Sequence, residues 1–143
     1  MKILILNGPN LNLLQFREAR YGQVSFEQYL SQLRSTFTED ELVYHQTNHE
    51  GDLIDTLQHA ADSYDGVVLN AGGYTHTSVA LRDAIAAIQL PVVEVHITDI
   101  LNREPFRQTS LIAAECIGSI IGFGLTSYDL GIRAIQNFYL PKE

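Results

Sequence analysis

The stretch GVVLNAGGYTHTS, residues 66–78, joins an apolar segment to a polar loop. Residues 66–70 are almost wholly apolar, which is typical of a strand buried on both faces of a parallel sheet. The loop that follows carries a glycine pair, several hydroxyl groups and His76. The stretch therefore predicts a buried parallel strand that ends in a polar loop.

Segments of two kinds alternate along the rest of the chain. Strands are expected at residues 2–7, 42–47, 66–70, 92–97 and within 116–123. Helices are expected at residues 25–37, 50–64, 77–88 and 126–138. Ser25 is the expected N-cap of the first helix, and Thr75 or Thr77 that of the third. The alternation predicts an α/β fold: a flavodoxin-like three-layer sandwich, with a five-stranded parallel sheet and helices on both faces. The length suits a single domain over residues 1–143.

Composition and charge exclude several classes of protein. The formal net charge of −8 argues against a nucleic-acid binder, because affinity for phosphates needs clustered Lys and Arg. Cys116 is the single cysteine, which rules out an internal disulfide and fits a reducing compartment. No stretch approaches the roughly 18 apolar residues of a membrane span. We therefore expect a cytoplasmic protein that binds neither membranes nor nucleic acids.

Three kinds of chemistry lack their sequence signatures. A Schiff-base mechanism needs a buried lysine, whereas only Lys2 and Lys142 occur, both near the chain ends. The five histidines show neither HExxH nor another zinc-site spacing. No GxGxxG or GxxxxGK[ST] motif is present, and Ser78 lacks a GxSxG context and is better explained as part of a helix start. We expect no metal and no other cofactor.

Polar residues follow four of the expected strands. They lie at residues 7–10, 47–49, 70–78 and 94–99. Turn and capping roles could explain each segment singly. In an open parallel sheet, however, ligands bind beyond the carboxyl ends of the strands, near the topological switch point. Four such loops at one edge favour a ligand site there.

Glu94 and His96 lie two positions apart on one expected strand, so their side chains share a face. A carboxylate beside an imidazole fixes its tautomer and favours the protonated, proton-donating ring. The alternative is a buried polar pair without a chemical role.

Tyr21 follows two arginines, Arg17 and Arg20, in the loop after the first strand. An unperturbed tyrosine has a pKa of about 10, so ionising it at pH 7 costs near 4 kcal/mol. A guanidinium that cannot lose its own proton stabilises the tyrosinate, which makes Tyr21 a candidate general base. The alternative is an exposed loop that Tyr21 only anchors.

The sequence resembles the type II 3-dehydroquinate dehydratases over nearly the whole chain. The matching motifs are NGPNLNLL (7–14), Arg-Glu…Tyr-Gly (17–22), NHEG (48–51), NAGGYTHTSVALRDA (70–84), EVHITD (94–99) and REPFR (103–107). The resemblance implies a flavodoxin-like fold and a homododecamer built as a tetramer of trimers. It also implies a shikimate-pathway lyase, without metal or Schiff base, that converts 3-dehydroquinate to 3-dehydroshikimate and water.

The resemblance implies catalytic roles for five residues. Tyr21 would remove a proton from C2 of the substrate, and Arg17 would lower the pKa of Tyr21. Asn10 would hold a water that stabilises the enolate oxygen. His96, oriented by Glu94, would protonate the departing C1 hydroxyl.

The resemblance also implies a set of substrate-binding residues. Asn70, the Ile97 amide and Thr98 would bind the carboxylate. His76 and Arg107 would bind ring hydroxyls. Asp83 would reach in from a neighbouring subunit.

Two departures from the family pattern matter. The family loop usually reads Arg-Glu-Pro, two more residues, then Tyr-Gly, and the loop here is one residue shorter and lacks the proline. Either Arg17 or Arg20 could therefore face Tyr21. Thr98 stands where the family usually has serine, and it keeps the hydroxyl.

Two other functions stay open at this stage. One is a non-catalytic flavodoxin-like binding protein that kept the pocket. The other is a metal-free lyase acting on a related hydroxy-keto acid.

Overall fold

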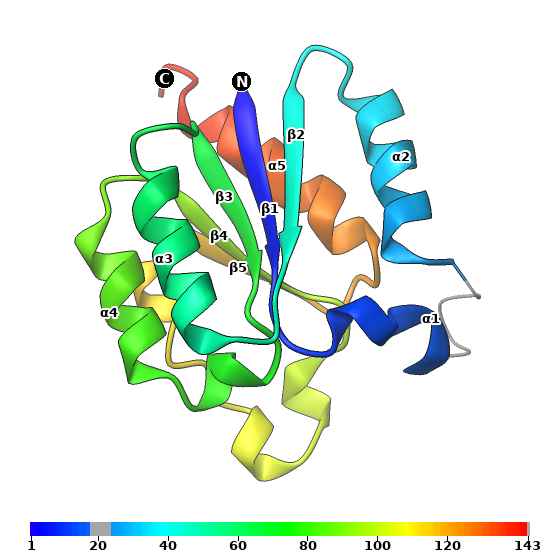
Figure 1. Ribbon diagram of the computed structural model, residues 1–143, viewed down its shortest axis with the longest axis vertical. Helices are drawn as coiled ribbons and strands as arrows, with labels where there is room; N and C mark the ends of the chain where they lie inside the picture. Colours follow the sequence, from blue (N-terminus) through cyan, green and yellow to red (C-terminus); the bar gives the residue numbers. More distant parts are fainter. Residues whose placement is uncertain (18–23, 143) are drawn as a thin grey trace.

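The computed structural model describes residues 1–17 and 24–142, which form a three-layer α/β sandwich (Figure 1). Its strands are β1 (Lys2–Asn7), β2 (Glu41–Gln46), β3 (Gly66–Asn70), β4 (Val92–His96) and β5 (Gly118–Ile121). Its helices are α1 (Leu14–Arg17), α2 (Phe26–Thr36), α3 (Glu50–Ala60), α4 (Val79–Ala87) and α5 (Thr126–Phe138). All strand pairs are parallel, in the order β2-β1-β3-β4-β5. This confirms the predicted flavodoxin-like fold.

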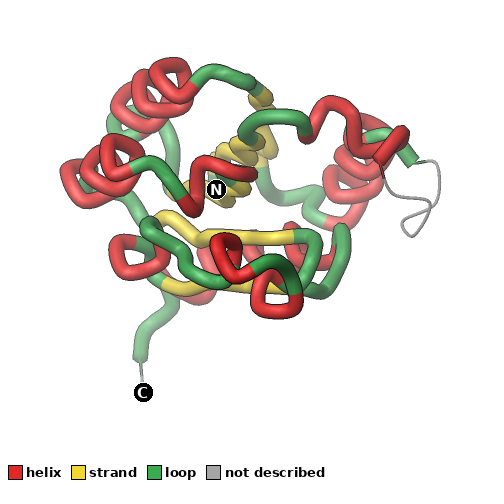
Figure 2. Tube along the Cα trace, turned by 90° about the horizontal axis from the view of Figure 1, so that it is seen from below, coloured by secondary structure: helices red, strands yellow, loops and turns green. Residues whose placement is uncertain are grey.

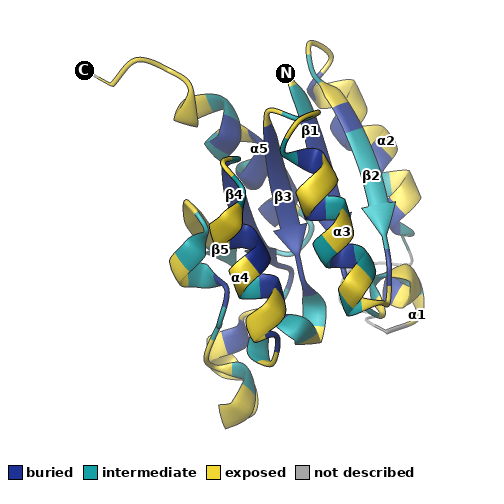
Figure 3. Cartoon of the chain, turned by 60° about the vertical axis from the view of Figure 1, so that its left-hand side comes forward, coloured by how far each residue is buried: buried dark blue, intermediate teal, exposed yellow. Residues whose placement is uncertain are grey.

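Side chains that alternate along the strands divide the core into two layers. Ile3 and Ile5 of β1 belong to the cluster with α2 and α5. Leu4 and Leu6 belong to the cluster with α3 and α4. Figure 3 shows the dark, fully buried central strands between helices whose outer faces are exposed. The apolar runs predicted burial on both faces, and β1, β3 and β4 confirm it. The two edge strands differ, because only Leu42 is buried in β2 and both Gly118 and Ser119 are exposed in β5.

Helix α2 begins where the sequence predicts. Ser25 has an extended backbone, and its hydroxyl accepts a hydrogen bond from the Gln28 amide. The Gln28 side chain accepts from the Ser25 amide in return, which completes a capping box.

The N-cap predicted for α4 was wrong. Thr75 lies inside a 3-10 turn, and Thr77 lacks the extended backbone that a cap needs. Ser78 has that backbone, and its hydroxyl accepts from the Leu81 amide at 2.9 Å. The role of Ser78 as a helix start is thereby confirmed.

The predicted helix at residues 50–64 was too long. The amides of Ser63 and Tyr64 both donate to the Ala60 carbonyl, so the chain turns there and α3 ends at Ala60.

The carboxyl ends of the strands carry the loops of interest. Figure 2 looks at the molecule from this edge and shows short helices and loops grouped around it. Both chain termini lie toward the opposite edge (Figure 1). None of the helices described has the length and apolar composition to cross a membrane.

The loops after β1 and β3 are in backbone contact, and this contact should not tolerate a side chain at Gly8. The Gly8 amide donates to the Asn70 carbonyl at 2.7 Å. A Cβ on Gly8 would lie 2.6 Å from the Ala71 carbonyl oxygen, which is backbone and cannot yield. We expect Gly8→Ala to lower the free energy of unfolding by roughly 1–3 kcal/mol, measured by denaturant unfolding.

Gly51→Ala is the matched control for this prediction. Gly51 lies in α3, and a Cβ there meets no atom within 4 Å. Alanine should therefore stabilise the helix, by up to about 0.5–1 kcal/mol. Equal stability of the two variants would contradict the steric explanation.

Candidate active site

An open pocket of about 190 Å³ lies at the carboxyl edge of the sheet. Its walls include Pro9 and Asn10 after β1, Gly72 after β3 and Thr98 after β4. The chain runs from β1 outward to β2 on one side and later to β3 on the other, so this is the topological switch point. The volume is below the roughly 300–1,000 Å³ of drug-sized sites, which suits a small metabolite.

The structure brings most of the predicted site residues together. Seven of them line the pocket: Asn10, Asn70, His76, His96, Ile97, Thr98 and Arg107. Glu94 is buried behind His96 and does not line it.

The remaining predicted residues lie elsewhere. Asp83 is exposed on α4 and is absent from the lining of this pocket. Tyr21 and Arg20 lie outside the described residues, and Arg17 is placed only as the last residue of α1.

The loop after β1 is held by the loop after β2. Asn10 adopts a left-handed backbone with φ of 68°, which asparagine tolerates better than most residues. The backbone N–H of Asn10 donates to the Asn48 side-chain oxygen at 3.0 Å. Gln46 donates to the same oxygen and to the Gly8 carbonyl. Asn48 of the loop after β2 thus holds the backbone of Asn10 at the pocket wall, and Gln46 at the end of β2 positions Asn48.

Asn70 is oriented by a buried hydroxyl on α5. Its side-chain NH₂ donates to the Tyr128 hydroxyl at 2.9 Å, and its side-chain oxygen accepts from the Gly72 backbone N–H at 3.1 Å. Tyr128 donates onward to the side-chain oxygen of Asn7 at 2.8 Å. Burial raises the pKa of Tyr128, so the phenol stays neutral. Asn70 lines the pocket, and within residues 1–17 and 24–142 its second side-chain N–H has no acceptor, so it can bind a ligand there.

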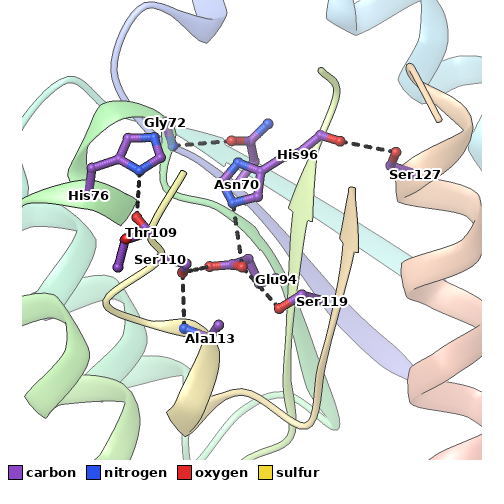
Figure 4. A network of polar contacts seen from close by, with 10 residues as sticks. All are labelled: Asn70, Gly72, His76, Glu94, His96, Thr109, Ser110, Ala113, Ser119 and Ser127. Carbon is purple, nitrogen blue, oxygen red and sulfur yellow. Dashed lines mark hydrogen bonds and ion pairs between the residues drawn. The ribbon is translucent and has the colours of Figure 1, made fainter. Parts of the chain in front are cut away.

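Glu94 and His96 form the pair predicted from their spacing (Figure 4). The His96 Nε2 atom lies 3.5 Å from a Glu94 carboxylate oxygen, and both side chains are buried. Burial would raise the pKa of Glu94, but the contacts with His96, Ser110 and Ser119 outweigh it and hold the pKa below its usual value. The pair is therefore a carboxylate beneath an imidazole at the end of β4.

His76 is fixed by one ring nitrogen. Its Nδ1 lies 2.8 Å from the Thr109 carbonyl, which can only accept, so Nδ1 carries a proton. In the neutral ring the other nitrogen is an acceptor for a ligand hydroxyl. The His76 and His96 rings lie 6.5 Å apart between centroids (Figure 4).

Two guanidinium groups give the pocket a positive wall. Arg103 and Arg107 both line it. Glu104 lies 3.0 Å from Arg107 Nε and 3.7 Å from Arg103 Nε. One carboxylate between two arginines leaves a local positive charge, which suits an anionic ligand.

Sequence reasoning missed several supporting residues. Arg103 could have been found, because it opens the motif REPFR that also contains Arg107. Ser110, Ser119 and Tyr128 carry no local signal, since their partners lie 16, 25 and 58 or more residues away.

These features define a doubly wound α/β protein with a positive, histidine-lined pocket at the switch point. Within residues 1–17 and 24–142, no group of three or more His, Cys, Asp or Glu side chains is placed to hold a metal ion.

Comparison with known proteins gives the family. Residues 1–136 match the family model described as dehydroquinase class II. The chain is 59% identical to the 3-dehydroquinate dehydratase of Exiguobacterium sp., with 94% of each chain covered. It is 49% identical to that of Carboxydothermus hydrogenoformans, over 100% of this chain and 95% of the relative. The chain belongs to the class II dehydroquinase family, as the motifs predicted.

Solved structures agree with this assignment. The crystal structure of type II dehydroquinase from Butyrivibrio crossotus matches with a TM-score of 0.91 and 40% identity, covering 95% of this chain and 97% of the other. A dehydratase-like protein from Bifidobacterium longum matches with a TM-score of 0.67 and 28% identity, covering 96% of each chain.

Removing the Tyr128 hydroxyl should destabilise the fold beneath the pocket. Tyr128→Phe leaves the side chains of Asn7 and Asn70 buried without this partner. A buried polar group left unsatisfied costs about 1–3 kcal/mol, and we expect a loss of that size in denaturant unfolding. Tyr139→Phe is the control, because the Tyr139 hydroxyl also donates a hydrogen bond but the residue is exposed. Similar losses in the two variants would contradict the role of the buried bridge.

Proposed function

We propose that this chain dehydrates 3-dehydroquinate to 3-dehydroshikimate, a step of the shikimate pathway. The observation that carries the proposal is the set of predicted ligand-binding residues around one pocket, in a chain 59% identical to a 3-dehydroquinate dehydratase. The substrate is a small carboxylate with ring hydroxyls, and the pocket offers arginines, amides and histidines.

In the proposed complex, the end of β4 and the end of β3 hold the substrate carboxylate. The Ile97 amide, the Thr98 hydroxyl and the free N–H of Asn70 are the donors. His76 and Arg107 bind ring hydroxyls, and Arg103 adds positive charge at the rim. All of these residues line the pocket, which supports the assignment.

The reaction begins with loss of the proton on C2. Tyr21 takes this proton as general base, and a neighbouring arginine, Arg17, favours its ionised form. Leu14, three residues before Arg17, lines the pocket, so the chain that leads to Tyr21 starts at the pocket wall. A water held by Asn10 donates to the enolate oxygen, and one such donor is worth roughly 3–4 kcal/mol.

The reaction ends with loss of the C1 hydroxyl. His96 gives a proton to this group as the C1–O bond breaks, so water leaves and the conjugated enone forms. The His96 Nε2 atom is buried against Glu94, so the proton is delivered from Nδ1. Proton return from Tyr21 to His96 through solvent restores the enzyme.

The mechanism needs neither metal nor imine. Lys2 lies at the amino end of β1, the edge opposite the pocket, and Lys142 belongs to the chain end drawn toward that same edge (Figure 1). A Schiff base at this pocket therefore has no lysine to form it.

The proposal includes a homododecamer, a tetramer of trimers, in the cytoplasm. In it Asp83 completes the pocket of a neighbouring subunit. The exposure of Asp83 on α4 and its absence from its own pocket support this role.

The direct test is the ultraviolet absorbance of the enone formed from 3-dehydroquinate. The unmodified protein should produce it, and Tyr21→Phe should lower kcat by about 10²–10⁴-fold, because only the ionisable oxygen is lost. Tyr64→Phe is the control, since Tyr64 lies at the far end of β3 from the pocket. No absorbance change at high enzyme concentration would favour a non-catalytic binding protein. Turnover of a related hydroxy-keto acid instead would identify a different lyase.

The partner of Tyr21 can be assigned by a pair of variants. We expect Arg17→Ala to lower activity at pH 7 by about 10- to 1000-fold, the range in which an opposite charge shifts an ionisation. Arg20→Ala should cost less, since Arg17 matches the family motif through Glu18. The reverse ranking would assign the role to Arg20.

A further inference from the structure

We propose that Ser110 and Ser119 are positioning residues that hold Glu94 as a carboxylate aimed at His96. This inference rests on the proposed role of His96 as the acid. It goes beyond that role because it names the groups that, together with His96, keep the buried carboxylate of Glu94 ionised and oriented.

The sheet register places Ser119 beside Glu94. The two residues are partners in the parallel β4–β5 pair, so their side chains share one face of the sheet. The Ser119 hydroxyl donates to Glu94 Oε1 at 2.9 Å. The same oxygen lies 3.5 Å from His96 Nε2. Ser119 therefore fixes the oxygen that faces the imidazole.

Ser110 holds the other oxygen of the carboxylate. Its hydroxyl lies 2.5 Å from Glu94 Oε2 and accepts a hydrogen bond from the Ala113 amide at 3.1 Å. Because that amide occupies a lone pair of the hydroxyl, the hydroxyl proton is directed at Glu94. Each carboxylate oxygen thus receives one O–H donor (Figure 4), an arrangement that favours the anion over the acid.

These hydroxyls act where a cation would otherwise be expected. Glu94 is fully buried, and across the described residues no ion pair joins it to a lysine or arginine. The other titratable groups nearby are His96 and Cys116. Burial, and then the charge of Glu94, raises the pKa of Cys116 to about 12, so the thiol is neutral and supplies no charge. Arg82 of α4 pairs with Glu115, the neighbour of Cys116, at 3.0 Å, so that carboxylate balances the charge of Arg82.

The segment that carries Ser110 also fixes His76. The Thr109 carbonyl accepts from His76 Nδ1 at 2.8 Å. The Leu111 amide donates to the Thr75 carbonyl at 2.8 Å, next to His76 in the chain. Three consecutive residues therefore set the positions of both pocket histidines, one directly and one through Glu94.

The test combines kinetics with infrared spectroscopy on the full-length protein. We expect the double variant Ser110→Ala/Ser119→Ala to lose about 10- to 100-fold in kcat with little change in KM, because misorientation of the acid affects the transition state. The infrared carbonyl band of protonated Glu94 is identified by its absence in Glu94→Gln. On lowering the pH, this band should appear in the double variant about one pH unit higher than in the unmodified protein. The single variant Ser119→Thr keeps both hydroxyls. Its kcat and the pH at which its Glu94 band appears should therefore match those of the unmodified protein.

Ser127→Ala is the matched control. It removes a buried hydroxyl that donates to the His96 carbonyl at 3.3 Å and does not touch Glu94. It should lower stability and leave the Glu94 band in place. A double variant with unchanged kcat and an unchanged Glu94 titration would overturn the inference, as would an equal band shift in Ser127→Ala. If the unmodified protein forms no enone, the proposed function fails while the infrared titration still decides the state of Glu94.

Discussion

The hydroxyl group of Tyr128 joins the ends of the two central strands at the switch point. Asn7 and Asn70 are register partners on β1 and β3, and both are buried where the apolar core gives way to polar loops. One phenol satisfies an oxygen of the first amide and an N–H of the second. Since buried polar groups need partners, the rest of the pocket floor depends on this bridge. The close contact between Gly8 and Ala71 lies directly beyond it.

Two polar networks reach the pocket from opposite faces of the sheet, because side chains alternate along each strand. Asn70 is held from the face covered by α5, where Tyr128 lies. Glu94 and His96 alternate with Val93 and Val95, which belong to the α5 layer, so the polar pair occupies the other face. The two networks converge only because β3 and β4 are neighbours and end at the same edge. The proposed roles in substrate binding and in proton delivery therefore belong to separate hydrogen-bond networks.

The sequence predicted those features that depend on neighbouring positions along the chain. The strand at residues 66–70 and the helix at residues 126–138 match the structure residue for residue, and the shared face of Glu94 and His96 follows from a two-residue spacing. Ser119 could not be predicted, because its contact with Glu94 depends on the β4–β5 register. The end of α3 was missed because apolar periodicity continues past the turn that closes at Ala60. The role of Tyr21 stays a prediction, since it lies outside the described residues.

Elimination of water needs a base and an acid that act on adjacent carbons without neutralising each other. The proposed acid belongs to a strand: His96 ends β4, and beside it lies a buried carboxylate held by two hydroxyls. The proposed base belongs to the chain that continues from α1, whose residue Leu14 contacts the pocket. The carboxylate beneath His96 and the guanidinium proposed beside Tyr21 have opposite charges. In the proposed mechanism each charge lies beside the group that it supports, the carboxylate beside the acid and the guanidinium beside the base. Because the two proposed pairs come from separate elements, the acid and the base are supported independently of each other.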